Sequence, residues 1–234
     1  DLIEKKITKK TKAILPVHWG GKICDMKKIS QISKKYSIPI VEDACHAILS
    51  RRFGKFAGNF GDMGCFSLHP LKNLNAWGDG GFIAIKNFKD FKKLSLMRNH
   101  GLVSRNKTLM FSYNSRLDTI QAVVANHLLK KLKNITKKRI LNSKYLDKNL
   151  SFFKEIQLIQ RESNSTEVFH LYCLRVKNKK KEIVMKLKKN GIDVKVHYPV
   201  PMHLQPAAKN LGYKKGSFPI TEKIHAEVLS LPIS

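Results

Sequence analysis

Short apolar segments recur through the first part of the chain, each bounded by polar or turn-forming residues. Four of them predict buried strands, at residues 13–19, 38–44, 64–68 and 80–85. Amphipathic segments separate these strands. Strands that alternate with helices favour an α/β fold built on a largely parallel, covered sheet.

Two of the separating segments predict helices, at residues 25–36 and 88–101. Asp25 can cap the start of the first helix, and the glycine at 101 can close the second. One face of the first helix carries Met26, Ile29, Ile32 and Ser33.

The pattern changes at Leu117. Residues 117–150 predict one or two long helices, followed by a strand at 167–176. A further helix ending at Gly191, another strand and a loop rich in proline and histidine complete the chain. We therefore expect a larger part at residues 1–116 and a long helix with a smaller α+β domain at residues 117–234.

Composition is compatible with a folded protein that has a substantial core. The chain has 234 residues, of which 42% are hydrophobic, and no apolar run approaches the ~20 residues of a membrane span. Its net charge of +28 invites a nucleic-acid interpretation. The excess is mostly lysine spread over polar helix faces, however, and arginine is scarce. We expect neither a nucleic-acid nor a membrane partner.

Cysteine and histidine usage gives no sign of a disulfide framework or a metal site. The four cysteines form no C-x-x-C pair, and the nine histidines show no zinc-binding spacing. This usage predicts free thiols in a reducing cytoplasm and no metal.

Candidate chemistry begins where the segment 38–44 ends. Glu42 and Asp43 close this predicted strand, and His46 follows three residues after Asp43. Ligands of α/β sheets sit at the C-terminal ends of strands. There an acid can face a cationic ring nitrogen, and an imidazole can lie against an aromatic ligand. The alternative is that Asp43 merely caps a helix that begins at Ala44.

Lys72 is the one lysine between residues 61 and 81, beside the glycine-rich turn at 78–81. Burial would lower its pKa, and a neutral amine can form a Schiff base with an aldehyde cofactor. Pyridoxal 5′-phosphate needs such a lysine together with an acid at its pyridine nitrogen. Ser67 can offer a hydroxyl to its phosphate. The alternative is an ordinary surface lysine.

Four motifs carry a resemblance to a known family. "VEDACHA", "GDMGCFSLHPLKNLNAWGDGGFIAI", "YNSRLDTIQA" and "HYPVPMHLQPA" occur in this order. The order resembles that of the sugar aminotransferases of the DegT/DnrJ/EryC1/StrS family, which are fold-type-I enzymes dependent on pyridoxal phosphate. The resemblance covers essentially the whole chain. It implies that residues 1–116 are the C-terminal part of the large cofactor-binding domain, and that residues 117–234 contain the small domain.

The resemblance also implies roles for single residues. Lys72 would be the Schiff-base lysine and general acid–base, and Asp43 would pair with the pyridine nitrogen. His46 occupies the position of a residue that stacks on the cofactor ring, and Ser67 that of a serine that contacts the phosphate. Asn114 resembles the asparagine that reaches the phosphate bound by the partner subunit, which implies a homodimer with a shared site.

The implied reaction moves an amino group from a donor, expected to be glutamate, to a keto sugar carried on a nucleotide. The product would be an amino sugar for surface polysaccharides or glycoconjugates. His197, Tyr198 and His203 are candidate substrate contacts, although the prolines around them can equally stiffen a connection over packed aromatics. Amination at C3 and at C4 both remain open.

The chain also departs from the family pattern. The family carries a segment ahead of the region matched here, including a loop that binds the cofactor phosphate. We therefore interpret this chain as a fragment of such an enzyme that lacks the N-terminal segment. We expect it alone to bind the cofactor weakly, and an inactive fragment remains one of the alternatives. Two other functions stay open: a sugar dehydratase of the same family, which the retained Lys72 disfavours, and a non-catalytic protein that binds an anionic partner through its basic surface.

Overall fold

A computed structural model describes residues 2–234. In this part the chain forms two compact units. The first consists of the chain up to Lys137 together with Ser163–His170, and the second of Lys138–Glu162 and Leu171–Ser234. The free cysteines predicted from the sequence are confirmed for all four residues, of which Cys173 alone is buried.

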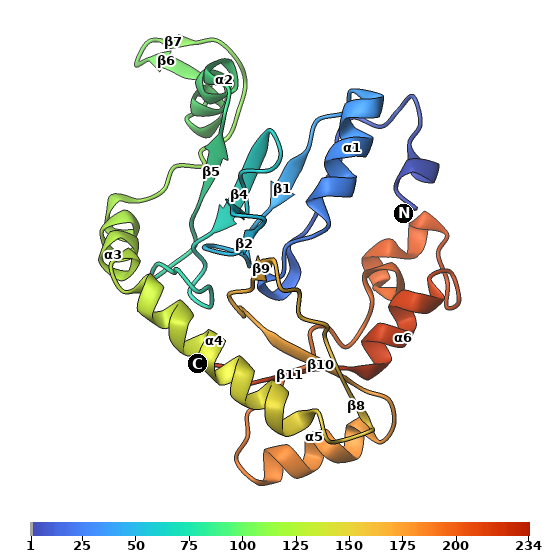
Figure 1. Cartoon of the computed structure of the whole chain (residues 1–234). Helices are drawn as coiled ribbons and strands as arrows, with labels where there is room; N and C mark the ends of the chain where they lie inside the picture. The colour runs from blue at the N-terminus through green and yellow to red at the C-terminus, as the bar shows by residue number, and fades with distance from the viewer. Residues whose placement is uncertain (1) are drawn as a thin grey trace. The chain divides into compact units, whose positions relative to one another are not determined.

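The central sheet of the first unit has the order β1-β4-β5 (Figure 1). Its strands are β1 (Val41–Asp43), β4 (Met63–Ser67) and β5 (Gly81–Ile85). β1 and β4 are parallel, with Asp43 opposite Cys65, whereas β5 runs antiparallel to β4. The strands predicted at 38–44, 64–68 and 80–85 are thus confirmed, each somewhat shorter or shifted at its ends.

The short strand predicted within residues 13–19, running into a loop, is wrong. This segment makes two isolated parallel bridges instead, Ile14 with Ile40 and Val17 with Asp43. Pro16 lies between them and has no backbone N–H to donate, although its carbonyl accepts a bond from the Asp43 amide. The segment therefore borders β1 without forming a regular strand.

Short strands and helices complete the first unit. The short strands are β2 (Arg51–Arg52), β3 (Lys55–Phe56) and β9 (Ser165–Thr166), in the order β3-β2-β9, and the hairpin of β6 (Leu102–Ser104) and β7 (Lys107–Thr108). The helices are η1 (Glu4–Lys6), η2 (Trp19–Gly21), α1 (Met26–Tyr36), α2 (Phe88–Arg98) and α3 (Thr119–Leu129). α2 and the β6–β7 hairpin extend beyond the end of β5 (Figure 1).

α1 lies beside β1 and supplies one side of the core (Figure 1). Asp25 caps it by accepting a bond from the Lys28 amide, as the sequence predicts. Met26 and Ile29 are buried and belong to the same cluster as Ile40. Each such side chain contributes roughly 1.5–3 kcal/mol through burial. This packing holds β1, and with it the acids at its end.

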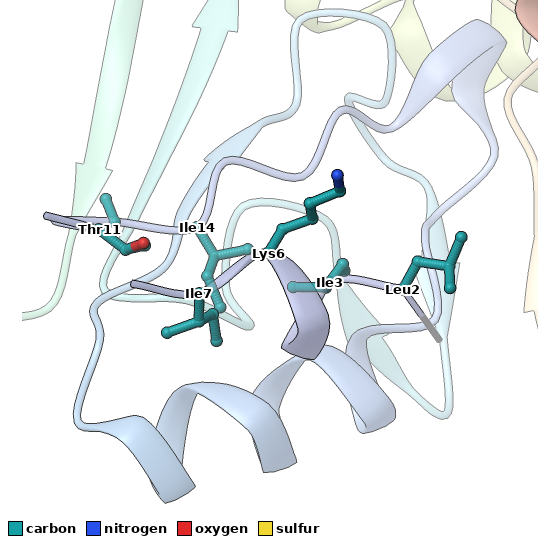
Figure 2. Close-up of a pocket in the computed structure, with 7 residues that line it drawn as sticks. Leu2, Ile3, Lys6, Ile7, Thr11 and Ile14 are labelled. Atoms are coloured by element: carbon teal, nitrogen blue, oxygen red, sulfur yellow. The ribbon is translucent and has the colours of Figure 1, made fainter. Parts of the chain in front are cut away.

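The edge of this core opens into a hollow near the start of the chain (Figure 2). Its volume is about 380 Å³, and it is lined by Leu2, Ile3, Lys6, Ile7, Thr11, Ala13 and Ile14. None of the residues with predicted chemistry is among them. The hollow is therefore separate from the candidate site.

The second unit is built on an antiparallel sheet of order β11-β10-β8. Its elements are β8 (Ile156–Leu158), β10 (Tyr172–Val176), β11 (Val228–Leu231), α5 (Lys180–Lys189), α6 (Pro219–Glu227), η3 (Met202–Leu204) and η4 (Pro206–Leu211). The strand predicted after α5 is wrong. The chain there makes a single bridge from Lys195 to Ser230, because it only touches the sheet edge.

The long helical region predicted after residue 116 is confirmed as two helices, α3 and α4 (Leu132–Leu150). α4 begins in the first unit and continues into the second. In the second unit, Asp147 of α4 accepts bonds from Arg161 and from the hydroxyl of buried Tyr172. None of the helices within residues 2–234 combines the length and apolar character that a bilayer crossing requires.

Candidate active site

The parallel pairing of β1 and β4 brings distant residues to one edge of the sheet. Asp43 is the last residue of β1, and Ser67 is the last residue of β4. Lys72 lies in the turn that follows β4. Since parallel strands end at the same edge, three of the predicted site residues belong to one neighbourhood.

Lys72 is half-buried in a tight turn. Its backbone N–H donates to the His69 carbonyl at 2.8 Å, and its carbonyl accepts from the Asn75 side chain at 3.3 Å. Burial lowers the pKa of its amine, while the nearby Cys45 and Asp43 partly oppose this shift. The direction is the one that nucleophilic chemistry at an aldehyde requires.

Asp43 is half-buried, and its Oδ1 accepts a bond from the Cys45 amide at 3.0 Å. Residues 44–49 form turns, so the alternative in which Asp43 caps a helix is wrong. The short aspartate side chain instead satisfies the backbone two residues on, which stabilises a turn. Burial, then Asp43, raises the pKa of the Cys45 thiol to about 12, which keeps it protonated at neutral pH.

Glu42 points to the other side of the same strand and is completely buried. It accepts bonds from His18 Nε2 at 2.8 Å and from the amides of Gly58 at 2.8 Å and Gly61 at 2.6 Å. Burial alone would raise the pKa of Glu42, but these donors outweigh it and lower the pKa. The Cys24 amide donates to Nδ1 of His18, and the ring donates to Glu42 from Nε2.

His46 sits in an aromatic group that sequence reasoning did not find. Its ring centroid lies 5.0 Å from that of Trp19 and 4.1 Å from that of His170. Its Nδ1 accepts a bond from the Gly20 amide at 3.3 Å. The sequence signal for His170 is a polar residue inside the apolar segment 167–176, and only the fold connects it with His46.

Ser67 and Asn114 occupy different surroundings. The Ser67 hydroxyl oxygen accepts a bond from the His69 amide at 3.2 Å, which leaves its hydrogen available for an anion. Asn114 is exposed on the loop after β7 and stands apart from these contacts. Its Oδ1 accepts from the Arg116 amide at 3.4 Å, and its backbone bridges to Asn99.

The remaining predicted residues belong to the second unit. His197 Nδ1 pairs with the Ser230 hydroxyl at 2.9 Å, and burial lowers its pKa, with Lys195 adding to the effect. His203 Nε2 pairs with Glu222 at 3.0 Å. Tyr198 is 54% exposed. Two of these three side chains thus take part in contacts that stabilise the second unit itself.

The residues at the sheet edge fit pyridoxal phosphate in their chemistry. They offer an amine with a lowered pKa, a carboxylate, a hydroxyl at a strand end and an imidazole held by neighbouring rings. Within residues 2–234, no cluster of three histidine, cysteine or acidic side chains is arranged to hold a metal ion.

Comparison with known proteins extends this picture. The model of the DegT/DnrJ/EryC1/StrS aminotransferase family matches residues 1–234. The pleiotropic regulatory protein of Geobacillus stearothermophilus is 36% identical over 99% of this chain and 62% of its own length. The dTDP-3-amino-3,6-dideoxy-alpha-D-galactopyranose transaminase of Aneurinibacillus thermoaerophilus is 38% identical over 99% of this chain and 63% of its own.

Solved structures agree with these relatives. DesV of S. venezuelae, in complex with a ketimine intermediate, superposes with a TM-score of 0.95 at 34% identity. It is matched over 99% of this chain and 62% of its own. The PLP-form of Spr1654 from Streptococcus pneumoniae gives a TM-score of 0.91 at 26% identity over 100% of this chain and 66% of its own. The predicted α/β fold class is confirmed, and the chain spans just over three fifths of the curated relatives it matches.

Proposed function

Because this chain belongs to the DegT/DnrJ/EryC1/StrS aminotransferase family, we propose that it transfers an amino group to a nucleotide-linked keto sugar with pyridoxal 5′-phosphate as cofactor. The observation that carries the proposal is that Lys72 and Asp43 interact at the edge of the sheet formed by β1 and β4, where burial lowers the pKa of the lysine amine. Relatives named as transaminases of dTDP- and UDP-linked sugars support the substrate class.

Each residue of the proposed site has a role that follows from its chemistry. When bound, the cofactor supplies an aldehyde for the amino group and a ring that accepts electrons. Lys72 would hold the cofactor through its aldehyde carbon, and its amine would take and return a proton as general base and acid. Asp43 holds a proton on the ring nitrogen. His46 covers one face of the ring, and Ser67 donates its hydroxyl hydrogen to the phosphate.

The amino donor, the position of amination and the oligomeric state are proposed from the same family membership. Glutamate is the proposed amino donor, and the names of several relatives, which specify 3-amino or 3-oxo sugars, favour amination at C3. We place His197, Tyr198 and His203 near the sugar nucleotide. Exposed Asn114 would reach the phosphate of a second copy, so the active form is a homodimer. The net charge of +28 suits an anionic nucleotide.

A second candidate function is regulation without catalysis. It is favoured by the names of two relatives, a pleiotropic regulatory protein and the sensory transduction protein EryC1 of Saccharopolyspora erythraea. Such a protein would bind an anionic partner without forming a covalent adduct at Lys72. The retained lysine also argues against a dehydratase of the same family, which carries histidine at that position.

The test uses reduction by borohydride. The protein is mixed with one equivalent of pyridoxal phosphate and reduced, and the modified peptide is located by mass spectrometry. We expect the label at Lys72 and its loss in Lys72→Ala. Lys27→Ala, a change of an exposed lysine on α1, is the matched control and should keep the label. Labelling spread evenly over many lysines, unchanged in Lys72→Ala, would refute the proposal.

Activity is then measured with glutamate and a panel of nucleotide-linked 3-keto and 4-keto sugars. We expect 2-oxoglutarate to appear only with a 3-keto sugar. Turnover with the 4-keto sugars alone would refute the C3 assignment and leave the cofactor assignment intact.

A further inference from the structure

The residue after the proposed catalytic lysine makes a hydrogen bond with each polar atom of its side chain. Asn73 is 8% exposed, and its amide group faces a segment almost a hundred residues away. Nδ2 donates to the Val168 carbonyl at 3.1 Å, and Oδ1 lies 3.4 Å from Nδ1 of His170. Since Oδ1 can only accept, His170 donates from Nδ1. Asn73 thus ties the Lys72 turn to residues 168–170.

This segment is itself firmly held. Val168 is completely buried and Phe169 is 6% exposed. A Cβ placed on Gly21, whose φ is +104°, would lie 3.0 Å from the Phe169 amide nitrogen and 3.0 Å from a Val168 methyl. The segment therefore packs directly against the backbone of η2, where only glycine fits. Asn73 is anchored to a rigid part of the first unit.

The same segment holds the ring of His46. The His170 and His46 centroids lie 4.1 Å apart with their planes tilted by 41°. The Gly20 amide donates to Nδ1 of His46, so this nitrogen carries no proton and the ring is neutral. A neutral imidazole can lie against a protonated pyridine ring without charge repulsion. The contacts run without a break from Lys72 through Asn73 and His170 to His46.

We propose that Asn73 and His170 are positioning residues, which fix the Lys72 turn relative to the His46 ring and so set the space that the cofactor ring enters. The inference rests on the proposed function for the identity of that cofactor. Its physical basis is preorganisation, because a reactive group held by buried hydrogen bonds and packed rings loses little freedom on binding. Neither residue needs to touch the cofactor.

The first experiment needs no cofactor. Competitive labelling of amines with acetic anhydride across a pH series, followed by peptide mass spectrometry, reports the titration of Lys72. Asp43 and Cys45 are the titratable groups beside it. In Asn73→Ala and in His170→Phe, which keeps a ring against His46, the turn loosens and Lys72 becomes more solvated. Its titration then moves toward that of an ordinary lysine, and labelling at pH 8 falls about threefold.

A double variant tests whether Asn73 and His170 act on Lys72 through the same contact. The double variant should lose no more than Asn73→Ala alone, because both changes remove the same hydrogen bond. Matched changes at exposed positions, Asn134→Ala and His127→Phe, should leave the Lys72 curve unchanged. Circular dichroism confirms that each variant is folded. An unchanged curve in folded His170→Phe, or additive effects in the double variant, would overturn the inference.

The second experiment adds pyridoxal phosphate and borohydride. The concentration that gives half-maximal labelling of Lys72 should rise about tenfold in Asn73→Ala and further in His170→Ala than in His170→Phe. Equal values for all variants and the parent would overturn the inference. Failure of the proposed function has a different signature: the parent protein itself gives no adduct at Lys72, and the cofactor-free titration alone then decides whether Asn73 and His170 position the lysine.

Discussion

Glu42 and Asp43 are adjacent acids at the end of one strand, yet their surroundings differ completely. Glu42 is fully buried and receives three hydrogen bonds, one from His18 and two from backbone amides. Asp43 is half-buried, accepts one bond from a local amide and lies near Lys72. Alternation along the strand turns one side chain into the interior and the other toward the site.

The difference shows how one strand can serve both stability and chemistry. A carboxylate saturated with donors is fixed and has no capacity left for a ligand. A carboxylate with one local bond keeps lone pairs that can accept a further hydrogen bond from a ligand. The backbone of His18 also donates to the Asp43 carbonyl at 3.0 Å, so the Glu42 side supports the strand end that presents Asp43.

The largest effect should come from Asp43→Asn. The amide still accepts the Cys45 bond, so the free energy of unfolding should change by less than about 1 kcal/mol. The proposed contact with the ring nitrogen loses its negative charge, and amino transfer should slow about a thousandfold, ~4 kcal/mol in the barrier. Single-turnover kinetics with glutamate measure the rate, and urea unfolding measures stability. A rate within tenfold of the parent would remove Asp43 from the proposed site.

Glu42→Gln should reduce stability, whereas Asp43→Asn should leave it nearly unchanged. The amide loses the charge and directs its N–H₂ group toward donors, so we expect unfolding to become easier by about 3 kcal/mol. Urea unfolding followed by circular dichroism gives the value. Glu162→Gln, a half-buried acid in the second unit, is the comparison variant and should change stability less. If Glu42→Gln were no less stable than the parent, the distinction between the two acids would fail.

The dependence of stability on pH in acid solution tests the same difference between Glu42 and Asp43. The pKa of Glu42 is lower in the folded protein than its ordinary 4.5, so its contribution to stability is complete above that pH and is lost as pH falls through the folded-state value. The stability difference between the parent and Glu42→Gln should therefore be larger at pH 5 than in more acidic solution. It should shrink as pH falls toward 3. A difference that grows on acidification would contradict a lowered pKa.

Much of the fold could be predicted because it depends on local patterns. The periodicity of Met26 and Ile29 and the cap at Asp25 are properties of a single segment, and the structure reproduces them. The segment 13–19 has the composition of a strand, but the proline within it and its place beside β1 reduce it to two bridges. Strand formation depends on a partner, which no single segment contains.

The candidate site could be predicted only in part, for a related reason. Lys72 and Asp43 stand out through neighbours in sequence, namely a glycine-rich turn and a strand end. Asn73 and His170 are separated by 97 positions, and nothing in either segment indicates that they meet. The partner of Glu42 likewise lies 24 residues away, at His18. Residues that hold the site residues in place without belonging to the site are recognised only once the fold is known.

A smaller effect is expected in the loop that precedes α6. His203 pairs with Glu222, which also accepts bonds from the Gly216 amide. His203→Asn removes one bond of this group, and we expect unfolding to become easier by about 1 kcal/mol. Thermal and urea unfolding measure the change, with His127→Asn at an exposed position as control. Equal stability of the two variants would mean that the pair contributes nothing.

The smallest effect on stability should come from Asn114→Ala. The side chain is exposed and bonds only weakly to the Arg116 amide, so the free energy of unfolding should change by less than about 0.5 kcal/mol. Under the proposed homodimer, however, Asn114 of one copy completes the phosphate site of the other. Half-maximal labelling of Lys72 should then require about tenfold more pyridoxal phosphate. Unchanged labelling would show that Asn114 does not contact the cofactor phosphate. The side chain is exposed, so no structural effect of the substitution could hide the loss of such a contact.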